Sequence, residues 1–139
     1  MQKACDFLAR REHSRRELRQ KLSRNCKDDE LIEELLDKLS AEGLQSDARF
    51  AESFVQQRYN KGQGPLKIKQ ELNQRGIDTG LIADCLNADQ LDWLALAEQT
   101  RVKKFGSDVP RDYQNKAKQS RFLYSRGFTS EQISLVLKE

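Results

Sequence analysis

Apolar side chains recur along the chain at the spacing of amphipathic helices. Leu31, Ile32, Leu35, Leu36 and Leu39 follow the i, i+1, i+4, i+5, i+8 pattern that places side chains on one helix face. No stretch shows sustained alternation of polar residues with Val, Ile or Thr, so a β-sheet is not expected. The pattern therefore predicts an all-α protein.

The apolar pattern also repeats about every 50 residues. Stretches anchored on Leu22, Leu72 and Leu123 each place an isoleucine ten residues later and a leucine fourteen residues later. Each unit contains an opening helix, a second helix and a short third helix. The opening helices are expected at residues 3–12, 47–59 and 92–105, and the second helices at 14–25, 64–77 and 116–128. We expect three tandem three-helix (helix-turn-helix-like) repeats, residues 1–44, 45–87 and 88–139, forming an elongated, curved molecule.

Residues with capping chemistry mark the ends of the expected helices. Ser14 with Glu17, and Thr129 with Gln132, form capping-box patterns. Pro65 suits the first turn of a helix, where its missing N–H costs nothing. Glycines follow the periodic segments where a left-handed residue would end a helix. They are Gly43, Gly76, Gly106 and Gly127.

The formal net charge of +3 conceals an alternation of sign along the chain. Residues 1–27, 28–52, 53–76, 77–98 and 99–139 carry charges of +6, −7, +4, −5 and +5. Basic residues gather on the second helix of each repeat and at the end of the first, whereas the third helices of the first two repeats are acidic. The pattern favours a surface that meets a charged partner. Chance clustering of charges on solvated helices is the alternative.

The basic side chains of these stretches are the candidate contacts for DNA or for a protein partner. They are Arg10, Arg11, Arg15, Arg16, Arg58, Lys61, Lys67, Lys69, Arg75, Lys103, Lys104, Lys118, Arg121 and Arg126. Tyr59, Tyr113 and Tyr124 lie among them and are candidates for stacking on bases or for packing at the rim. Direct binding to DNA is expected to be weak and salt-sensitive, since the acidic third helices repel phosphates.

The residue types and spacings argue against an enzyme. His13 is the only histidine and is interpreted as a surface loop residue. Cys5, Cys26 and Cys85 fall on or near apolar faces without a CxxC motif, which indicates buried thiols in a reducing compartment. The segment 62–64 lacks the other parts of a phosphate-binding loop, and no segment has the length of a membrane span. We therefore expect a cytoplasmic monomer with no metal, cofactor or catalytic site.

The central segment reads LQSDARFAESFVQQRYNKGQGPLKIKQELNQRGI (residues 44–77). Its motifs Arg49-Phe50-Ala51, Lys61-Gly62-Gln63-Gly64-Pro65 and Arg75-Gly76-Ile77 resemble the signature of the RecX family of bacterial recombination regulators. The flanking segments 8–22 and 121–128 look like the first and third modules of that family. The resemblance therefore extends over nearly the whole chain.

The resemblance implies a negative regulator of the RecA recombinase with no cofactor. Such a protein is expected to bind the RecA–DNA filament in its groove. It would inhibit filament growth, strand exchange, ATPase and co-protease activity in homologous recombination, DNA repair and the SOS response. The alternative is a helical protein that binds single- or double-stranded DNA directly. The acidic or apolar third helices of the first two repeats make poor readers of a DNA groove.

Overall fold

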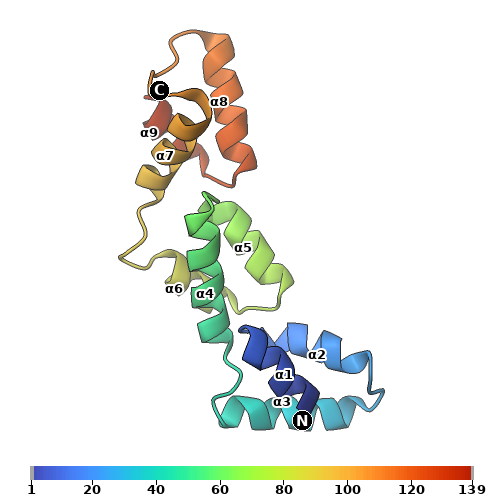
Figure 1. Cartoon of the computed structure of the whole chain (residues 1–139). Helices are drawn as coiled ribbons and strands as arrows, with labels where there is room; N and C mark the ends of the chain where they lie inside the picture. The colour runs from blue at the N-terminus through green and yellow to red at the C-terminus, as the bar shows by residue number, and fades with distance from the viewer. Residues whose placement is uncertain (1, 139) are drawn as a thin grey trace. The chain divides into compact units, whose positions relative to one another are not determined.

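The computed structural model describes residues 2–138 of the chain. Within this range the backbone forms nine α-helices and no strand, which confirms the predicted all-α class (Figure 1). The helices are α1 (Gln2–Arg10), α2 (Arg15–Ser23), α3 (Asp29–Ala41), α4 (Asp47–Asn60), α5 (Pro65–Gln74), α6 (Thr79–Leu86), α7 (Trp93–Phe105), α8 (Tyr113–Ser125) and α9 (Ser130–Leu137).

Both predicted capping boxes are present. The Ser14 hydroxyl accepts the Glu17 N–H at 3.1 Å, and the Glu17 carboxylate accepts the Ser14 N–H at 3.1 Å. Thr129 and Gln132 make the same reciprocal pair at 3.1 and 2.9 Å. Helix α5 begins at Pro65, and the four glycines predicted to end helices all have positive φ.

Helix α8 begins earlier than the sequence pattern predicts. It starts at Tyr113 rather than at residue 116, because the Asp112 side chain accepts the backbone N–H of Asn115 at 3.1 Å and caps the helix. The hydrogen bonds from Asn115 hold the pKa of Asp112 below its usual value. The extra turn brings Tyr113 into the helix.

The described residues pack as two compact units. Unit 1 comprises residues 2–54 and 72–85, and unit 2 comprises residues 55–71 and 86–138. The division passes through α4 and α5, so each of these helices contributes residues to both units. The repeat boundaries after residues 44 and 87 stay a prediction.

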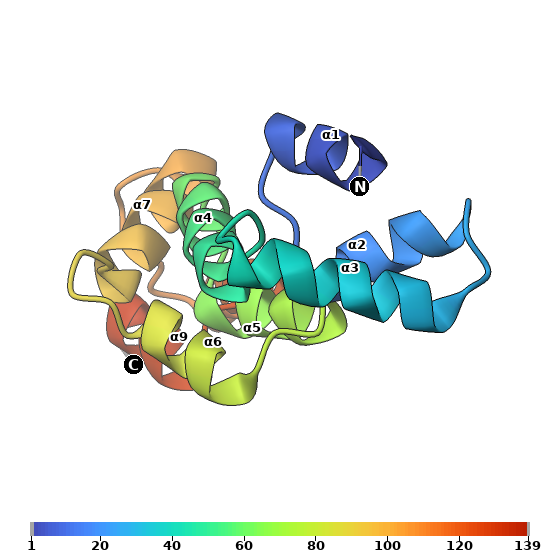
Figure 2. The same ribbon diagram turned by 90° about the horizontal axis from the view of Figure 1, so that it is seen from below.

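Unit 1 contains the core of the first three helices. Helices α2 and α3 lie side by side, as Figure 2 shows, and α1 also contacts α2. The buried core residues of these helices are Ala4, Leu18, Leu22, Ile32, Leu36 and Leu39. Leu31 is 54% exposed, because the buried face of α3 is narrower than the five-residue apolar stripe.

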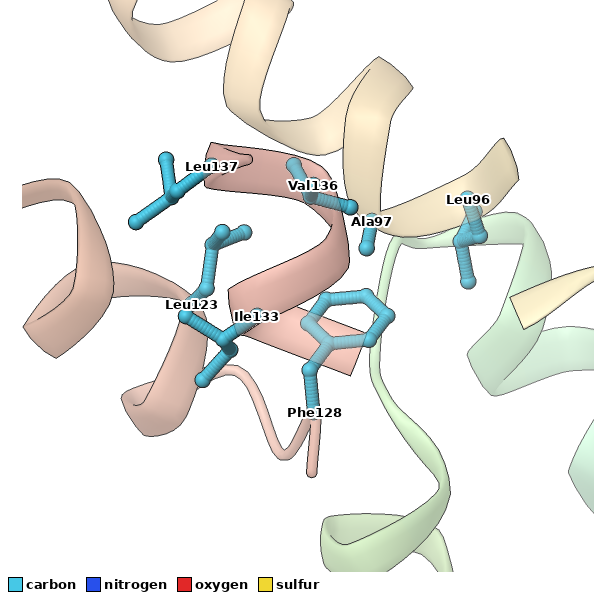
Figure 3. Packing of buried hydrophobic residues seen from close by; sticks show 7 residues of the cluster. All are labelled: Leu96, Ala97, Leu123, Phe128, Ile133, Val136 and Leu137. Carbon is cyan, nitrogen blue, oxygen red and sulfur yellow. The ribbon is translucent and has the colours of Figure 1, made fainter. Parts of the chain in front are cut away.

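Unit 2 contains the core of the last three helices. Figure 3 shows this cluster gathered between α7, α8 and α9. The partly buried side chains of Trp93, Tyr59 and Phe122 pack against it. Its buried members are Leu96, Ala97, Leu123, Phe128, Ile133, Val136 and Leu137. Leu94 is 42% exposed, because the core face of α7 is centred on Leu96 and Ala97.

Two glycine-containing turns bond to each other within unit 2. The Gly64 N–H donates to the Arg126 carbonyl at 2.7 Å, and the Leu66 N–H donates to the Gly127 carbonyl at 2.8 Å. A Cβ atom on Gly64 would lie 2.4 Å from the Gly127 carbonyl carbon, and one on Gly127 would lie 2.4 Å from the Lys67 Cβ. The close approach of these two backbones therefore requires glycine at both positions.

Candidate partner-binding surface

Two arginines predicted as contact residues bind acidic groups within unit 1. Arg15 Nη2 lies 2.8 Å from Glu33 Oε2 and 2.7 Å from Asp37 Oδ1, so its side chain joins α2 to α3. The hydrogen bond to the Glu33 carboxylate raises the pKa of Arg15. Arg11 Nη1 lies 3.3 Å from Glu17 Oε1. These two charges are partly neutralised by the protein itself.

Arg16 and Arg75 also make contacts inside unit 1. Arg16 donates to the Gln74 carbonyl at 3.3 Å. Arg75 Nε lies 3.7 Å from Glu17 Oε2, and its guanidinium lies over the Phe54 ring, 4.8 Å from the ring centroid. Both side chains therefore connect α2 to segments of the second repeat, and their positions are explained by packing.

The other predicted contact residues are mostly unengaged by acidic groups. Arg58 is the exception, with its Nε 3.4 Å from Glu71 Oε2. The rest form no ion pair within 4.0 Å in the part of the chain that the structure describes. They are Arg10, Lys61, Lys67, Lys69, Lys103, Lys104, Lys118, Arg121 and Arg126. Their charges remain available to a partner.

Four of these residues line one hollow in unit 2, which we call the basic hollow. Lys61 follows α4, Lys103 and Lys104 lie in the last turn of α7, and Arg126 follows α8. The hollow has a volume of about 450 Å³, and Asn60 and Gln99 are among its other polar lining residues. The structure thus brings together residues that are up to 65 positions apart in the sequence.

Sequence reasoning missed the two amides of the basic hollow. Gln99 precedes Lys103 by four residues, and Asn60 directly precedes Lys61. The spacing of four places Gln99 on the same helix face as Lys103, a signal that was available in the sequence. The half-buried ring of Phe122 also lines the hollow.

The three tyrosines have different environments. The Tyr59 ring packs edge-on against Trp93 with 5.2 Å between centroids, and its hydroxyl donates to the Asp92 carbonyl at 3.1 Å. Tyr59 is therefore a packing residue. Tyr113 and Tyr124 on α8 are 84% and 65% exposed, so their rings are accessible to a partner.

The prediction of His13 as a surface loop residue is wrong, because its side chain is 1% exposed. Its Nδ1 lies 3.1 Å from the Arg11 carbonyl, and its Nε2 lies 2.8 Å from Lys21 Nζ. These partners fit a neutral ring that donates from Nδ1 and accepts at Nε2. Burial, together with the charges of Arg11 and Lys21, lowers the pKa of His13. The centroid of the Phe7 ring lies 6.0 Å from the centroid of the His13 ring.

The acidic and thiol groups are distributed without a metal-binding cluster. Within residues 2–138, no three His, Cys, Asp or Glu side chains gather in a way that would hold a metal ion. All three cysteines are free, and only Cys85 is buried, which raises the pKa of its thiol. Cys5 and Cys26 are partly exposed, which departs from the predicted burial.

None of the helices in the described range has both the length and the apolar character needed to cross a membrane.

The fold and its surface define an all-α repeat protein that presents basic side chains to solvent. Three family models match consecutive parts of the chain: the first, second and third three-helix domains of RecX match residues 1–39, 46–86 and 90–137. The chain belongs to the RecX family.

Known proteins and solved structures agree with this assignment. The chain is 48% identical over 134 residues to "Regulatory protein RecX" of Pseudomonas entomophila (strain L48), covering 96% of this chain and 86% of that protein. It is 47% identical over 130 residues to the protein of the same name from Halorhodospira halophila, covering 94% and 81%. The crystal structure of RecX from Lactobacillus salivarius is similar at a TM-score of 0.82 and 26% identity, covering 99% of this chain and 91% of that one.

Proposed function

We propose that the protein is a negative regulator of the RecA recombinase that binds the RecA–DNA filament. The observation that carries this proposal is the match of all three RecX domains in consecutive order along the chain. The name "Regulatory protein RecX" carried by relatives at 47–48% identity supports a regulatory role.

The proposed mechanism is competition for the groove of the filament. A helical repeat protein bound there would hinder the addition of RecA subunits and the approach of a second DNA duplex. The expected consequences are slower filament growth, less strand exchange and ATP hydrolysis, and a weaker co-protease signal in the SOS response. The protein would act as a cytoplasmic monomer.

We assign the electrostatic part of this contact to basic residues without internal ion pairs. Lys69 on α5 and Lys118 and Arg121 on α8 are exposed and have no acidic partner within 4.0 Å among the described residues. Such charges contribute to association and orientation more than to folding. Arg15 and Arg16, by contrast, contribute to packing within unit 1.

A charge-reversal series tests this assignment. The triple variant Lys69→Glu, Lys118→Glu and Arg121→Glu should raise the concentration needed for half-inhibition of RecA ATPase by roughly tenfold or more, because like charges would then face the partner. The matched control, Lys27→Glu, Arg111→Glu and Lys138→Glu, changes the net charge equally at exposed positions outside the predicted set. Equal inhibition by the triple variant and the control would contradict the assignment.

A further inference from the structure

We propose that the basic hollow binds two consecutive phosphates of single-stranded DNA. This inference deepens the proposed function and rests on it for its context, since a RecA–DNA filament carries such a strand. It assigns DNA, and not the surface of a recombinase subunit, as the group that this part of unit 2 contacts.

The first argument is uncompensated charge. Lys61, Lys103, Lys104 and Arg126 line the hollow, and no carboxylate is among its lining residues. The acidic side chains of the α7 region are engaged elsewhere. Glu98 Oε1 lies 2.6 Å from Arg101 Nη2, and the Asp92 side chain accepts the Ala95 N–H at 3.0 Å as the cap of α7.

The number of charges favours a nucleic acid over a protein side chain. One carboxylate of a partner protein brings a single negative charge to four cations. A nucleic-acid strand brings one charge per nucleotide, so two consecutive phosphates provide a closer match. Lysines act as mobile point charges and arginine as a rigid fork, and both are usual phosphate ligands.

The second argument is that part of the hollow is preformed. The Arg126 carbonyl accepts the Gly64 N–H at 2.7 Å, which fixes the backbone of this residue. Its guanidinium lies over the Phe122 ring at 5.3 Å from the centroid, and Lys104 Nζ lies 5.7 Å from the same centroid. The aromatic ring therefore helps to position two of the four cations before any ligand arrives.

The position of Lys61 is also determined by the fold. Gly62 has a φ of +83°, and a Cβ atom at this position would lie 3.1 Å from Thr100 Oγ1 on α7. The turn that carries Lys61 therefore runs directly against α7, beside Gln99 and Lys103. This close approach places a third cation at the hollow without any movement of α4.

Size and shape favour a single strand over a duplex. The volume of about 450 Å³ lies within the range of pockets that enclose small ligands, about 300–1,000 Å³. A single strand is flexible enough to place neighbouring phosphates inside a concave site. A duplex is stiff, with a persistence length of about 150 base pairs, and presents its phosphates on a convex surface. The amides of Asn60 and Gln99 provide hydrogen-bonding groups for the sugar or base.

Fluorescence anisotropy with a labelled oligothymidylate tests the inference on the full chain. The double variant Lys103→Gln and Lys104→Gln should bind at least roughly tenfold more weakly at 50 mM salt. The slope of log K against log salt should become smaller in magnitude by about 1.4, or about 0.7 for each phosphate that the variant no longer neutralises. Lys103→Arg with Lys104→Arg should retain binding, because the charges remain.

The matched control is Arg111→Gln with Lys138→Gln, which removes two exposed charges of the third repeat outside the hollow. The control should change the slope by less than half as much. Unchanged binding by the Lys103/Lys104 glutamine variant would overturn the inference. An equal loss of affinity for a duplex of the same length would overturn the assignment to a single strand.

Inhibition of RecA, measured in parallel, separates this inference from the proposed function. If the glutamine variant binds oligothymidylate normally but no longer inhibits RecA, the hollow contacts protein and the inference is overturned. If the wild-type chain binds the oligonucleotide through the hollow but does not inhibit RecA, the inference stands and the proposed function fails.

Discussion

His13 illustrates how a single residue of unit 1 depends on its surroundings. The sequence places it in an arginine-rich loop, yet its ring is buried between the Arg11 carbonyl, Lys21 and Phe7. Glu17 is the acidic group whose charge favours protonation of the ring, but Glu17 is itself bonded to Arg11 and to the Ser14 N–H. Two positive side chains and burial therefore oppose protonation of the ring.

This arrangement predicts that the chain loses stability in mild acid. The pKa of His13 is lowered by burial in the folded chain, so the unfolded chain binds a proton first as the pH falls below about 6.5. The contribution of the neutral His13 ring to the free energy of unfolding is complete above that pH. It declines as the pH falls from 6.5 toward the pKa of His13 in the folded chain, by at most about 1.4 kcal/mol per pH unit. Urea unfolding between pH 7.5 and 5.5 measures it.

The matched control for this prediction is His13→Gln, which removes the only histidine. Its free energy of unfolding should vary less over the same pH interval, because carboxylates titrate mainly at lower pH. A pH dependence that is the same in the variant and in the wild-type chain would show that His13 is not its source.

Arg101 was not among the predicted contact residues, and its role is structural. The side chain is fully buried, and its guanidinium donates to Glu98 Oε1 at 2.6 Å and to Gln119 Oε1 at 3.3 Å. It also donates to the carbonyls of the loop that follows α7, at Gly106, Ser107 and Asp108. A charged residue on a basic helix thus fixes the α7–α8 loop.

At the scale of the elements, the paired turns of unit 2 explain a glycine-rich motif. The run Lys61-Gly62-Gln63-Gly64-Pro65 places Gly64 against Gly127. The N–H groups of Gly64 and Leu66 donate hydrogen bonds to the carbonyls of Arg126 and Gly127. The motif that could be mistaken for a phosphate-binding loop is therefore a contact between the α4–α5 and α8–α9 turns. Lys61 is the exposed basic side chain of this motif and is therefore accessible to a ligand.

We predict that Gly127→Ala destabilises the protein more than Gly106→Ala. Both glycines have positive φ, +99° and +94°, so alanine at either position costs about 1–2 kcal/mol of backbone strain. A Cβ atom at Gly106 meets nothing within 4 Å, whereas at Gly127 it would lie 2.4 Å from Lys67 Cβ. The difference between the two variants should be about 1–3 kcal/mol in urea unfolding. Equal destabilisation would show that the turns separate easily.

The helices were predictable because their signals are local. Capping boxes join residues three positions apart, and the apolar period lies within each helix. The sequence does not show which basic side chains are available to a partner, because Arg15 and Lys103 look alike in it. Arg15 meets Glu33, 18 residues away, and Arg16 meets the Gln74 carbonyl, 58 residues away. Only the tertiary structure shows which basic residues are engaged and which line the basic hollow.

At the scale of the whole molecule, the near-neutral total charge is a poor guide to function. The blocks of +6, −7, +4, −5 and +5 reflect three domains of one family, in which part of the basic charge holds helices together and part faces solvent. The proposed regulatory contact uses the second part. The acidic third helix of the first domain supplies Glu33 and Asp37, which are the internal ion-pair partners of Arg15.

The most direct test of the central claim is the DNA-dependent ATPase activity of RecA, titrated with this protein while occupancy of the single-stranded DNA is measured in parallel. A regulator of the filament should reduce ATP hydrolysis when the protein covers only a small fraction of the DNA sites, because one bound molecule affects several RecA subunits. Loss of ATPase activity only when the protein coats the DNA would contradict the account and favour a DNA-binding protein that acts without contacting RecA.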